Sequence, residues 1–192
     1  MNWTVNGIVS MIGASLTRPR SAAEALLARP ISVGDAMAAL GVSIIGSVML
    51  SFFLSGGAPI PLLLNVPPFG PFMLALFTIS MTTIFAVAVH LVGRAMGGQG
   101  DLAGAILVMA WIQVLQLAAQ VIFAFVTLVD PTLGSMLGFL VTLGLIWVLL
   151  SFLDVLHSLG GLGRAAFLLL MVVVGIALGL GFILTLIGVG ST

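Results

Sequence analysis

The chain has 192 residues, of which 61% are hydrophobic and only 5% are charged, whereas a soluble domain usually carries about 25% charged residues. Its five basic residues are all arginine and balance five acidic ones, so it lacks the clustered basic face of a nucleic-acid-binding protein. The absence of cysteine excludes disulfides and thiolate nucleophiles. The composition therefore predicts an integral membrane protein that does not bind nucleic acid.

Residues 1–35 are predicted to form an amphipathic, interfacial region on the cytoplasmic side. The first helix has a polar face of Asn2, Asn6, Ser10, Gly13 and Thr17 and an apolar face of Val5, Ile8, Met11, Ile12 and Leu16. Ser21 and Glu24 have the spacing of a capping box, which predicts a second helix from Ala22 to about Arg29, before Pro30. No basic residue precedes the first apolar stretch, so we expect no cleaved signal peptide.

Five apolar stretches then follow, each close to the roughly 20 residues that an α-helix needs to cross a bilayer. They are predicted at 36–54, 72–93, 102–129, 133–153 and 164–188, within a transmembrane domain of residues 36–188 and before a short extracytoplasmic tail, 189–192. Ser32 and Asp35 should cap the first span, and Asp101 the third. The fold class is all-α, a polytopic bundle of five transmembrane helices.

The arginines predict the orientation, because basic residues in short loops stay on the cytoplasmic side. With a cytoplasmic N-terminus all five arginines lie inside, and the opposite placement would export every one of them. We therefore expect a multi-pass protein of the bacterial inner membrane with its N-terminus cytoplasmic and its C-terminus extracytoplasmic. The proline-rich connection between the first two spans should dip into the outer interface.

Small residues at helical spacing indicate close helix contacts in lipid. Gly134 and Gly138 form one such pair in the fourth span, and Gly175 and Gly179 form another in the fifth. They indicate either packing within one chain or the seam of a homo-oligomer. Membrane lipids, and other membrane proteins or further copies of the chain, are the partners that we expect.

A polar face in the third span is the least expected feature of the apolar region. Gln113, Gln116, Gln120 and Thr127 share one side of this helix. Such side chains must face the bundle, because lipid offers them no hydrogen bonds. They either bond to serines and threonines of neighbouring spans or line a hydrated cavity for a small solute or a lipid headgroup.

Titratable side chains gather at the predicted cytoplasmic ends of the spans. We expect Asp154 to pair with Arg94 or Arg164 in an ionic cluster, although ordinary anchoring of helix ends is the alternative. The cluster would comprise His90, Arg94, Asp101, Asp154, His157 and Arg164.

The sequence contains no recognisable arrangement of catalytic or metal-binding residues. Ser151, Asp154 and His157 lie on one helix segment, and a single Asp-x-x-His is a weak metal signature. Glycines 97, 98 and 100 are followed by no Lys-Ser/Thr pair, so they form a turn and not a phosphate loop. We expect no catalytic residue, no metal and no cofactor.

The order of several motifs resembles the bacterial type of the Yip1 domain family. The carrying residues are Gly97-Gly98-Gln99-Gly100, Ala110-Trp111, Pro131, Trp147, Phe152 with His157, a glycine turn, and Arg164 before a glycine-studded last span. The resemblance covers roughly residues 18–188 and implies five spans with a cytoplasmic N-terminus.

Eukaryotic members are implied to act in vesicle traffic by binding prenylated GTPases through their N-terminal region. This chain has no tyrosine and no Asp-Leu-x-Gly-Pro signature, so we do not expect Rab-type GTPase binding. The sequence therefore favours a non-enzymatic scaffold or adaptor for membrane organisation. The alternative is transport or permeation of a small solute or lipid through a polar cavity lined by the third span.

Overall fold

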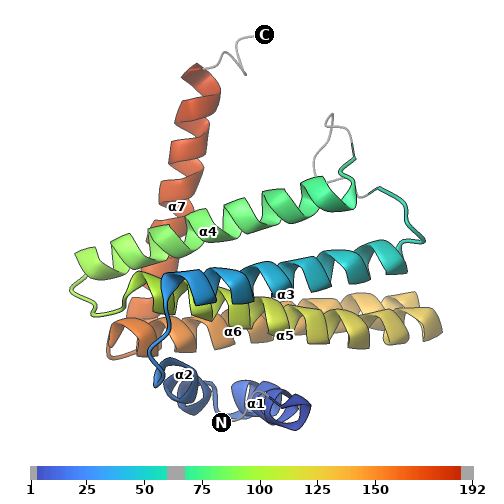
Figure 1. The fold of residues 1–192 in the computed structure, drawn as a ribbon, viewed down its shortest axis with the longest axis horizontal. Coiled ribbons are helices and arrows are strands. Elements are labelled where there is room, and N and C mark those ends of the chain that lie inside the picture. Colours follow the sequence, from blue (N-terminus) through green and yellow to red (C-terminus); the bar gives the residue numbers. More distant parts are fainter. Residues whose placement is uncertain (1–3, 60–67, 187–192) are drawn as a thin grey trace.

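The computed structural model describes residues 4–59 and 68–186, and these residues form seven α-helices (Figure 1). The helices are α1 (Val5–Thr17), α2 (Pro19–Leu27), α3 (Val33–Leu54), α4 (Pro71–Ala95), α5 (Leu102–Val129), α6 (Pro131–His157) and α7 (Leu162–Leu186). The described part of the chain is thus all-α, as the sequence predicts.

Side-chain caps begin three of the long helices. Ser32 Oγ accepts a hydrogen bond from the Asp35 backbone N–H at 3.1 Å, and Asp101 Oδ1 accepts one from Gly104 N–H at 2.8 Å, as expected. Asp130 caps α6 in the same way, accepting from Thr132 N–H at 2.7 Å. Each cap provides a partner for a backbone donor that the first turn of a helix leaves unpaired.

The predicted start of the second short helix is wrong by three residues. α2 begins at Pro19, and Arg18 at its N-cap makes no side-chain capping hydrogen bond. Proline suits the first helical position because its φ is already helical and its missing N–H would be unpaired there. Ser21 therefore lies inside the helix, and it does not form a capping box with Glu24.

Five helices, α3 to α7, are long and apolar enough to cross a membrane. They cover most of the five predicted stretches, and α6 extends four residues beyond the predicted end of its span. Residues 60–67 of the proline-rich connection, the last two residues of the predicted fifth span and the predicted tail 189–192 lie outside the described residues.

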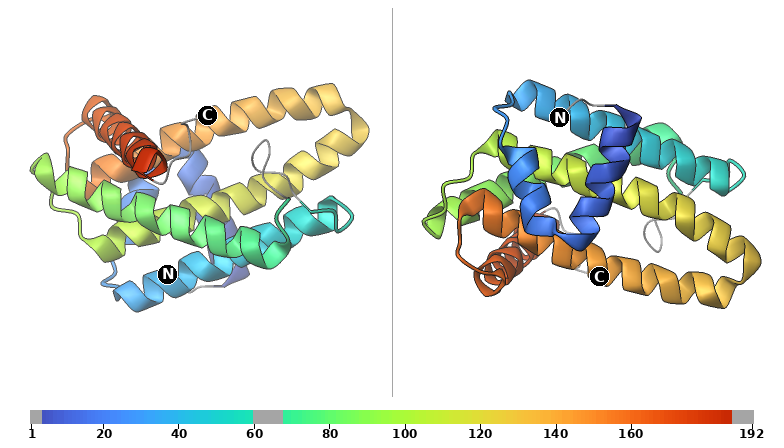
Figure 2. Two further views of the ribbon diagram at one scale, coloured as in Figure 1. Left: turned by 90° about the horizontal axis from the view of Figure 1, so that it is seen from above. Right: turned by 90° about the horizontal axis from the view of Figure 1, so that it is seen from below.

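Four of the long helices run side by side in alternating directions, and the fifth does not. α5 lies at the centre and contacts α3, α4 and α6, with its most extensive contact to α3 (Figures 1 and 2). α7 leaves the others at a steep angle after packing its first turns against α4 and α6. Val172 is still buried, but the C-terminal end of α7 stands clear of the other helices, and Phe182 and Leu186 are exposed there (Figure 1).

The amphipathic pair α1–α2 packs across the flank of the bundle, against α6 and the first half of α5 (Figure 2). Met11 and Leu26 are each only 4% exposed, and Ile8 and Ile12 pack against the same core. The predicted apolar face of α1 thus largely contacts protein, although Leu16 stays exposed. The described residues of the predicted polar face are exposed, as expected for the outer side of such a helix.

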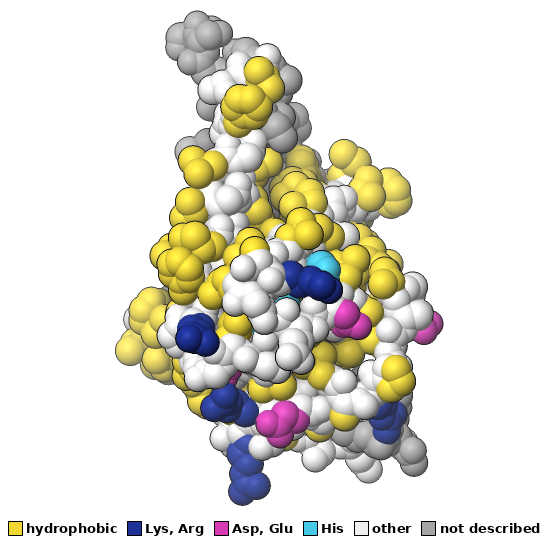
Figure 3. Space-filling model, turned by 90° about the vertical axis from the view of Figure 1, so that its left-hand side faces the viewer, with side chains coloured by type: hydrophobic (Ala, Val, Ile, Leu, Met, Phe, Trp, Pro, Cys, Tyr) yellow, Lys and Arg dark blue, Asp and Glu magenta, His cyan; other side chains and the backbone are white. Residues whose placement is uncertain are grey.

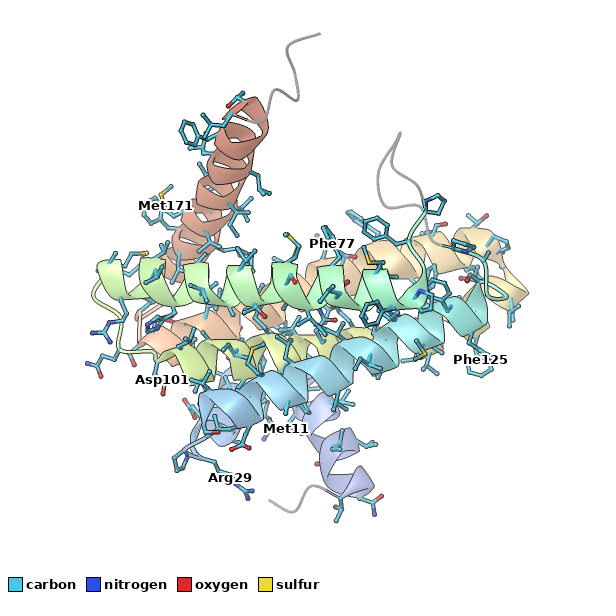
Figure 4. The ribbon with its side chains drawn as sticks, turned by 45° about the horizontal axis from the view of Figure 1, so that its top comes forward. Met11, Arg29, Phe77, Asp101, Phe125 and Met171 are labelled. Carbon is cyan, nitrogen blue, oxygen red and sulfur yellow. The ribbon has the colours of Figure 1, made fainter. Side chains whose placement is uncertain are left out.

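One end of the bundle carries most of the charge, and we call it the charged end. α3, α5 and α7 begin there, and α4 and α6 end there (Figure 1). Figure 3 views this end and shows the basic, acidic and histidine side chains gathered over it. In Figure 4 Asp101 and Arg29 lie toward the charged end, whereas Phe125 marks the opposite end.

Candidate functional site

His157 is a fully buried polar residue at the charged end. It is 1% exposed, and three glycines wall its ring: Gly93 on α4, and Gly98 and Gly100 in the α4–α5 connection. A Cβ on Gly98 would lie 2.7 Å from His157 Cβ, one on Gly100 would lie 2.8 Å from Cε1, and one on Gly93 would overlap the ring. The glycines are therefore needed for close approach to the histidine, and the ring has no room beside it for a ligand.

Backbone hydrogen bonds hold the glycine loop in this position. Gly98 N–H donates to Gly93 O at 2.8 Å, and Gln99 N–H donates to His157 O at 3.4 Å. His90 reaches the same loop, with Nδ1 3.1 Å from Gly100 O. The two histidines thus meet at the loop, and neither ring nitrogen of His157 has a hydrogen-bond partner among the described residues.

Asp154 joins the bundle to the N-terminal region and corrects the predicted pairing. Its Oδ2 forms an ion pair with Arg20 on α2, and its Oδ1 accepts a hydrogen bond from Gly161 N–H at 2.8 Å. Asp154 is 1% exposed, whereas the Arg20 side chain is 61% exposed. The expected partners were Arg94 and Arg164, which lie nearer along the chain on spanning helices.

The remaining members of the predicted ionic cluster have separate roles. Arg94 is exposed, Arg164 donates to Leu159 O at 3.2 Å, and Asp101 caps α5. The ion pair of Asp154 is with Arg20, which is not a member of the predicted cluster. The predicted side chains therefore share one end of the bundle without forming one ionic network.

A second polar contact fixes α1 to the bundle. Trp111 Nε1–H on α5 donates to Ser15 Oγ at 2.9 Å, and Ser15 Oγ donates to Met11 O at 2.8 Å. Both side chains are buried. This contact was not predicted from the sequence, although a tryptophan inside a buried helix requires an acceptor for its indole N–H.

A cavity of about 520 Å³ lies beside α2 at the charged end. Glu24, Arg29, Gln99 and Asp101 contribute its polar lining, and Leu27 and Leu156 contribute apolar walls. α2 and the connection that follows it thus form one side of a mixed-polarity hollow that a partner's side chains could enter.

The predicted glutamine face lines a second cavity, of about 470 Å³, among α3, α4, α5 and α6. Gln113, Gln116 and Gln120 all border it, together with the hydroxyl residues Ser47, Ser51, Thr78 and Thr142. The described residues that line it include no charged residue and no histidine. We call this space the glutamine cavity.

Hydrogen bonding in the glutamine cavity is incomplete. Gln120 Nε2–H donates to Ser47 Oγ at 2.8 Å, while Gln120 Oε1 is buried without a partner among the described residues. Ser51, Thr78 and Thr142 each donate to a carbonyl of their own helix. The side chains of Gln113 and Gln116 make no hydrogen bond within the described part of the chain. Gln120 thus bonds to a serine of a neighbouring span, whereas Gln113 and Gln116 border the cavity.

Thr127 does not belong to this cavity. Its hydroxyl donates to Phe123 O at 2.8 Å, and its Cβ would lie 3.1 Å from a Cβ on Gly134. Gly138 likewise faces the ring of Phe123. The glycine pair of α6 therefore packs within the chain against α5, whereas Gly175 and Gly179 of α7 face open space.

Comparison with protein families is consistent with this architecture. The model of the Yip1 domain matches residues 13–184, which include the end of α1, all of α2 to α6 and nearly all of α7. No curated protein and no solved structure is similar enough to the chain to count as a match.

Proposed function

The chain belongs to the Yip1 domain family, and we propose that it acts as a non-enzymatic scaffold for membrane organisation. It is a multi-pass membrane protein with five helices of spanning length. The proposal assigns recognition of other membrane proteins to the surface that α1–α2 presents at the charged end.

The docking of α1–α2 on the bundle carries this proposal. A free amphipathic helix would bury its apolar face in lipid and would move independently of the bundle. Here Met11 and Ile12 face protein, and the Arg20–Asp154 and Trp111–Ser15 contacts hold the pair in one place. A surface held in one conformation loses less entropy on binding, so it suits a scaffold.

The enclosure of His157 supports a non-enzymatic role. A general base must come within hydrogen-bond distance of the proton it abstracts, and three glycines shield this ring from any substrate. Ser151 is likewise occupied, since its hydroxyl donates to Trp147 O at 2.9 Å. Both polar residues thus support the packing of α6, and we assign no cofactor to the chain.

We place the protein in the bacterial inner membrane with the charged end in the cytoplasm. The arginines support this placement, because basic residues near span ends are retained inside. A reporter domain that is active only outside the cytoplasm should then be active when it is fused after Thr192. A cytoplasmic signal from that fusion would reverse the proposed orientation.

The test of the scaffold is native mass spectrometry after gentle release from the native membrane. The wild type should retain a partner protein in a fixed ratio, and Arg20→Gln should lower that occupancy about threefold, because it removes the partly solvent-screened ion pair that docks α2. Arg94→Gln is the matched control, since Arg94 lies exposed at the same end. Absence of any protein partner, or equal retention by Arg20→Gln, would contradict the proposal.

Transport through the glutamine cavity is the second candidate function, and the cavity itself is the observation that favours it. A permeation route would have to continue toward the charged end, but residues 103–112 of α5 are buried on all sides. The discriminating assay measures glycerol flux into proteoliposomes. If glycerol flux depends on the protein and falls with Gln116→Leu, the protein is a transporter and the scaffold proposal is wrong.

A further inference from the structure

We propose that the glutamine cavity is a binding site for an uncharged glycerolipid with one free hydroxyl, of the diacylglycerol class. This assignment is independent of the scaffold role, because it concerns the half of the bundle away from the charged end. It follows from the depth, charge, hydrogen-bonding capacity and opening of the cavity.

The depth of the cavity selects a ligand that resides in hydrocarbon. α5 has 28 residues and therefore extends about 42 Å, and Gln116 lies at its middle. The three glutamines occupy about 10 Å of the helix around this point. A ligand of the cavity must therefore reach the central plane of the bilayer.

The uncharged lining excludes ionic headgroups. A phosphate or ammonium group inside the cavity would have no counter-charge, and burying an unpaired ion in a medium of low dielectric constant is very unfavourable. Phospholipid headgroups are thereby rejected. A neutral glycerolipid has no ionic group that holds it at the membrane surface.

The hydrogen-bonding groups match the ligand. Gln120 Oε1 is a buried acceptor without a partner, so it requires a donor such as a hydroxyl group. The amide N–H groups of Gln113 and Gln116 can donate to ester carbonyls, which carry no proton of their own. Diacylglycerol offers one hydroxyl and two ester carbonyls.

The opening of the cavity allows the acyl chains to remain in the bilayer. Phe123 on α5 and Thr142 on α6 border the cavity and are also exposed on the surface of the bundle. A volume of about 470 Å³ lies within the usual range of ligand pockets and accommodates a glycerol ester headgroup. The lipid would enter sideways between these two helices, with its chains outside.

The experiment uses the full chain in phosphatidylcholine nanodiscs supplied with 1,2-dioleoylglycerol, and native mass spectrometry counts the retained lipid. We expect one dioleoylglycerol per chain. Dioleoyl phosphatidic acid, which is charged, and trioleoylglycerol, which lacks the hydroxyl donor, should each bind at least about tenfold more weakly. Equal retention of trioleoylglycerol would overturn the assignment of Gln120 to a hydroxyl group.

Variants test the site itself. Gln120→Leu should weaken retention about tenfold, whereas Gln99→Leu, the same change in the loop at the charged end, should leave it unchanged. Ala119→Leu keeps every polar group and fills the cavity, so it should abolish retention even if Gln120→Leu unfolds the protein. Retention by folded Ala119→Leu at the wild-type level would overturn the proposal.

Competition with free glycerol distinguishes a glycerolipid from a soluble polyol as the ligand of the cavity. An excess of glycerol should leave dioleoylglycerol bound, because the acyl chains contribute to binding. Displacement of the lipid by glycerol would show that a soluble polyol is the ligand and would overturn the lipid assignment. The scaffold role is tested separately, since Arg20→Gln leaves every residue of this cavity in place.

Discussion

The two halves of α5 differ in their burial and in the hydrogen bonding of their polar side chains. In the half near the charged end, residues 103–112 are buried on all sides, and Trp111 has a hydrogen-bond partner on α1. In the other half, Gln113 and Gln116 face a cavity, and residues such as Phe125 and Leu128 point outward. Polar groups near the charged end stabilise the packing, whereas Gln113 and Gln116 near the middle of α5 border an unfilled volume.

The largest expected effect comes from Gly93→Ala, which tests how closely the charged end is packed. The new Cβ would overlap the His157 ring, and overpacking of this kind should lower the free energy of unfolding by about 3 kcal/mol. Thermal unfolding in detergent, followed by tryptophan fluorescence, measures the loss.

Two variants control this prediction. Gly144→Ala meets no atom within 4 Å and should be neutral or slightly stabilising, because alanine favours a helix more than glycine does. The cost of Gly93→Ala should also shrink in a His157→Ala background, which removes the clashing ring. An unchanged cost there would exclude the histidine as the cause.

Asp154→Asn should have the next largest effect. It replaces a buried carboxylate that bonds to Arg20 and to the Gly161 N–H, and we expect the free energy of unfolding to fall by about 2 kcal/mol. Most of this loss should come from the buried Asp154 side, because solvent screens the charge of the exposed Arg20. Hydrogen exchange should rise across α2 and stay unchanged in α3. Asp35→Asn, at an exposed cap, is the control, and an equal loss from it would contradict the special role of Asp154.

Ser15→Ala should cost about 1 kcal/mol, because it leaves the buried Trp111 indole N–H without an acceptor. Replacing both partners, in Ser15→Ala with Trp111→Phe, should recover part of this loss when unfolding is followed by circular dichroism. Ser10→Ala, on the exposed face of α1, provides the control. If the double variant loses more free energy of unfolding than the two single variants lose together, the hydrogen bond is not the source of the effect.

The smallest effects are expected in the glutamine cavity. Gln120→Leu should lower stability by about 0.6 kcal/mol through loss of its bond to Ser47. Gln116→Leu should change stability by less than about 0.5 kcal/mol, since it breaks no hydrogen bond within the described residues. A larger loss for Gln116→Leu, measured by the same thermal unfolding, would mean that the two halves of α5 do not differ in this way.

Local patterns predicted most of the helices and their caps. Apolar stretches of spanning length identified α3 to α7, and Ser32 and Asp101 identified two helix starts, because both signals depend on residues close together in the chain. The glutamine face also followed from helical periodicity. Pro19 was the exception, since its preference for the first helical position competed with the capping-box spacing of Ser21 and Glu24.

The partners of the polar residues could not be predicted in the same way. Arg20 pairs with Asp154 across 134 positions, and Trp111 bonds to Ser15 across 96, so neither contact has a local signature. The same holds for Thr127, which shares a helix face with the glutamines and yet packs against Gly134. Thr127 lies close to the connection between α5 and α6 and is not among the residues that line the cavity.

The sequence alone determines that this protein is helical and lies in a membrane, and it places polar residues at one end and at mid-depth. Composition and helical periodicity suffice for that, because the low dielectric of lipid enforces internal backbone hydrogen bonding. The packing of distant helices determines how those residues act. It encloses His157 in glycines, docks α1–α2 through Asp154, and leaves an unfilled polar volume beside α5.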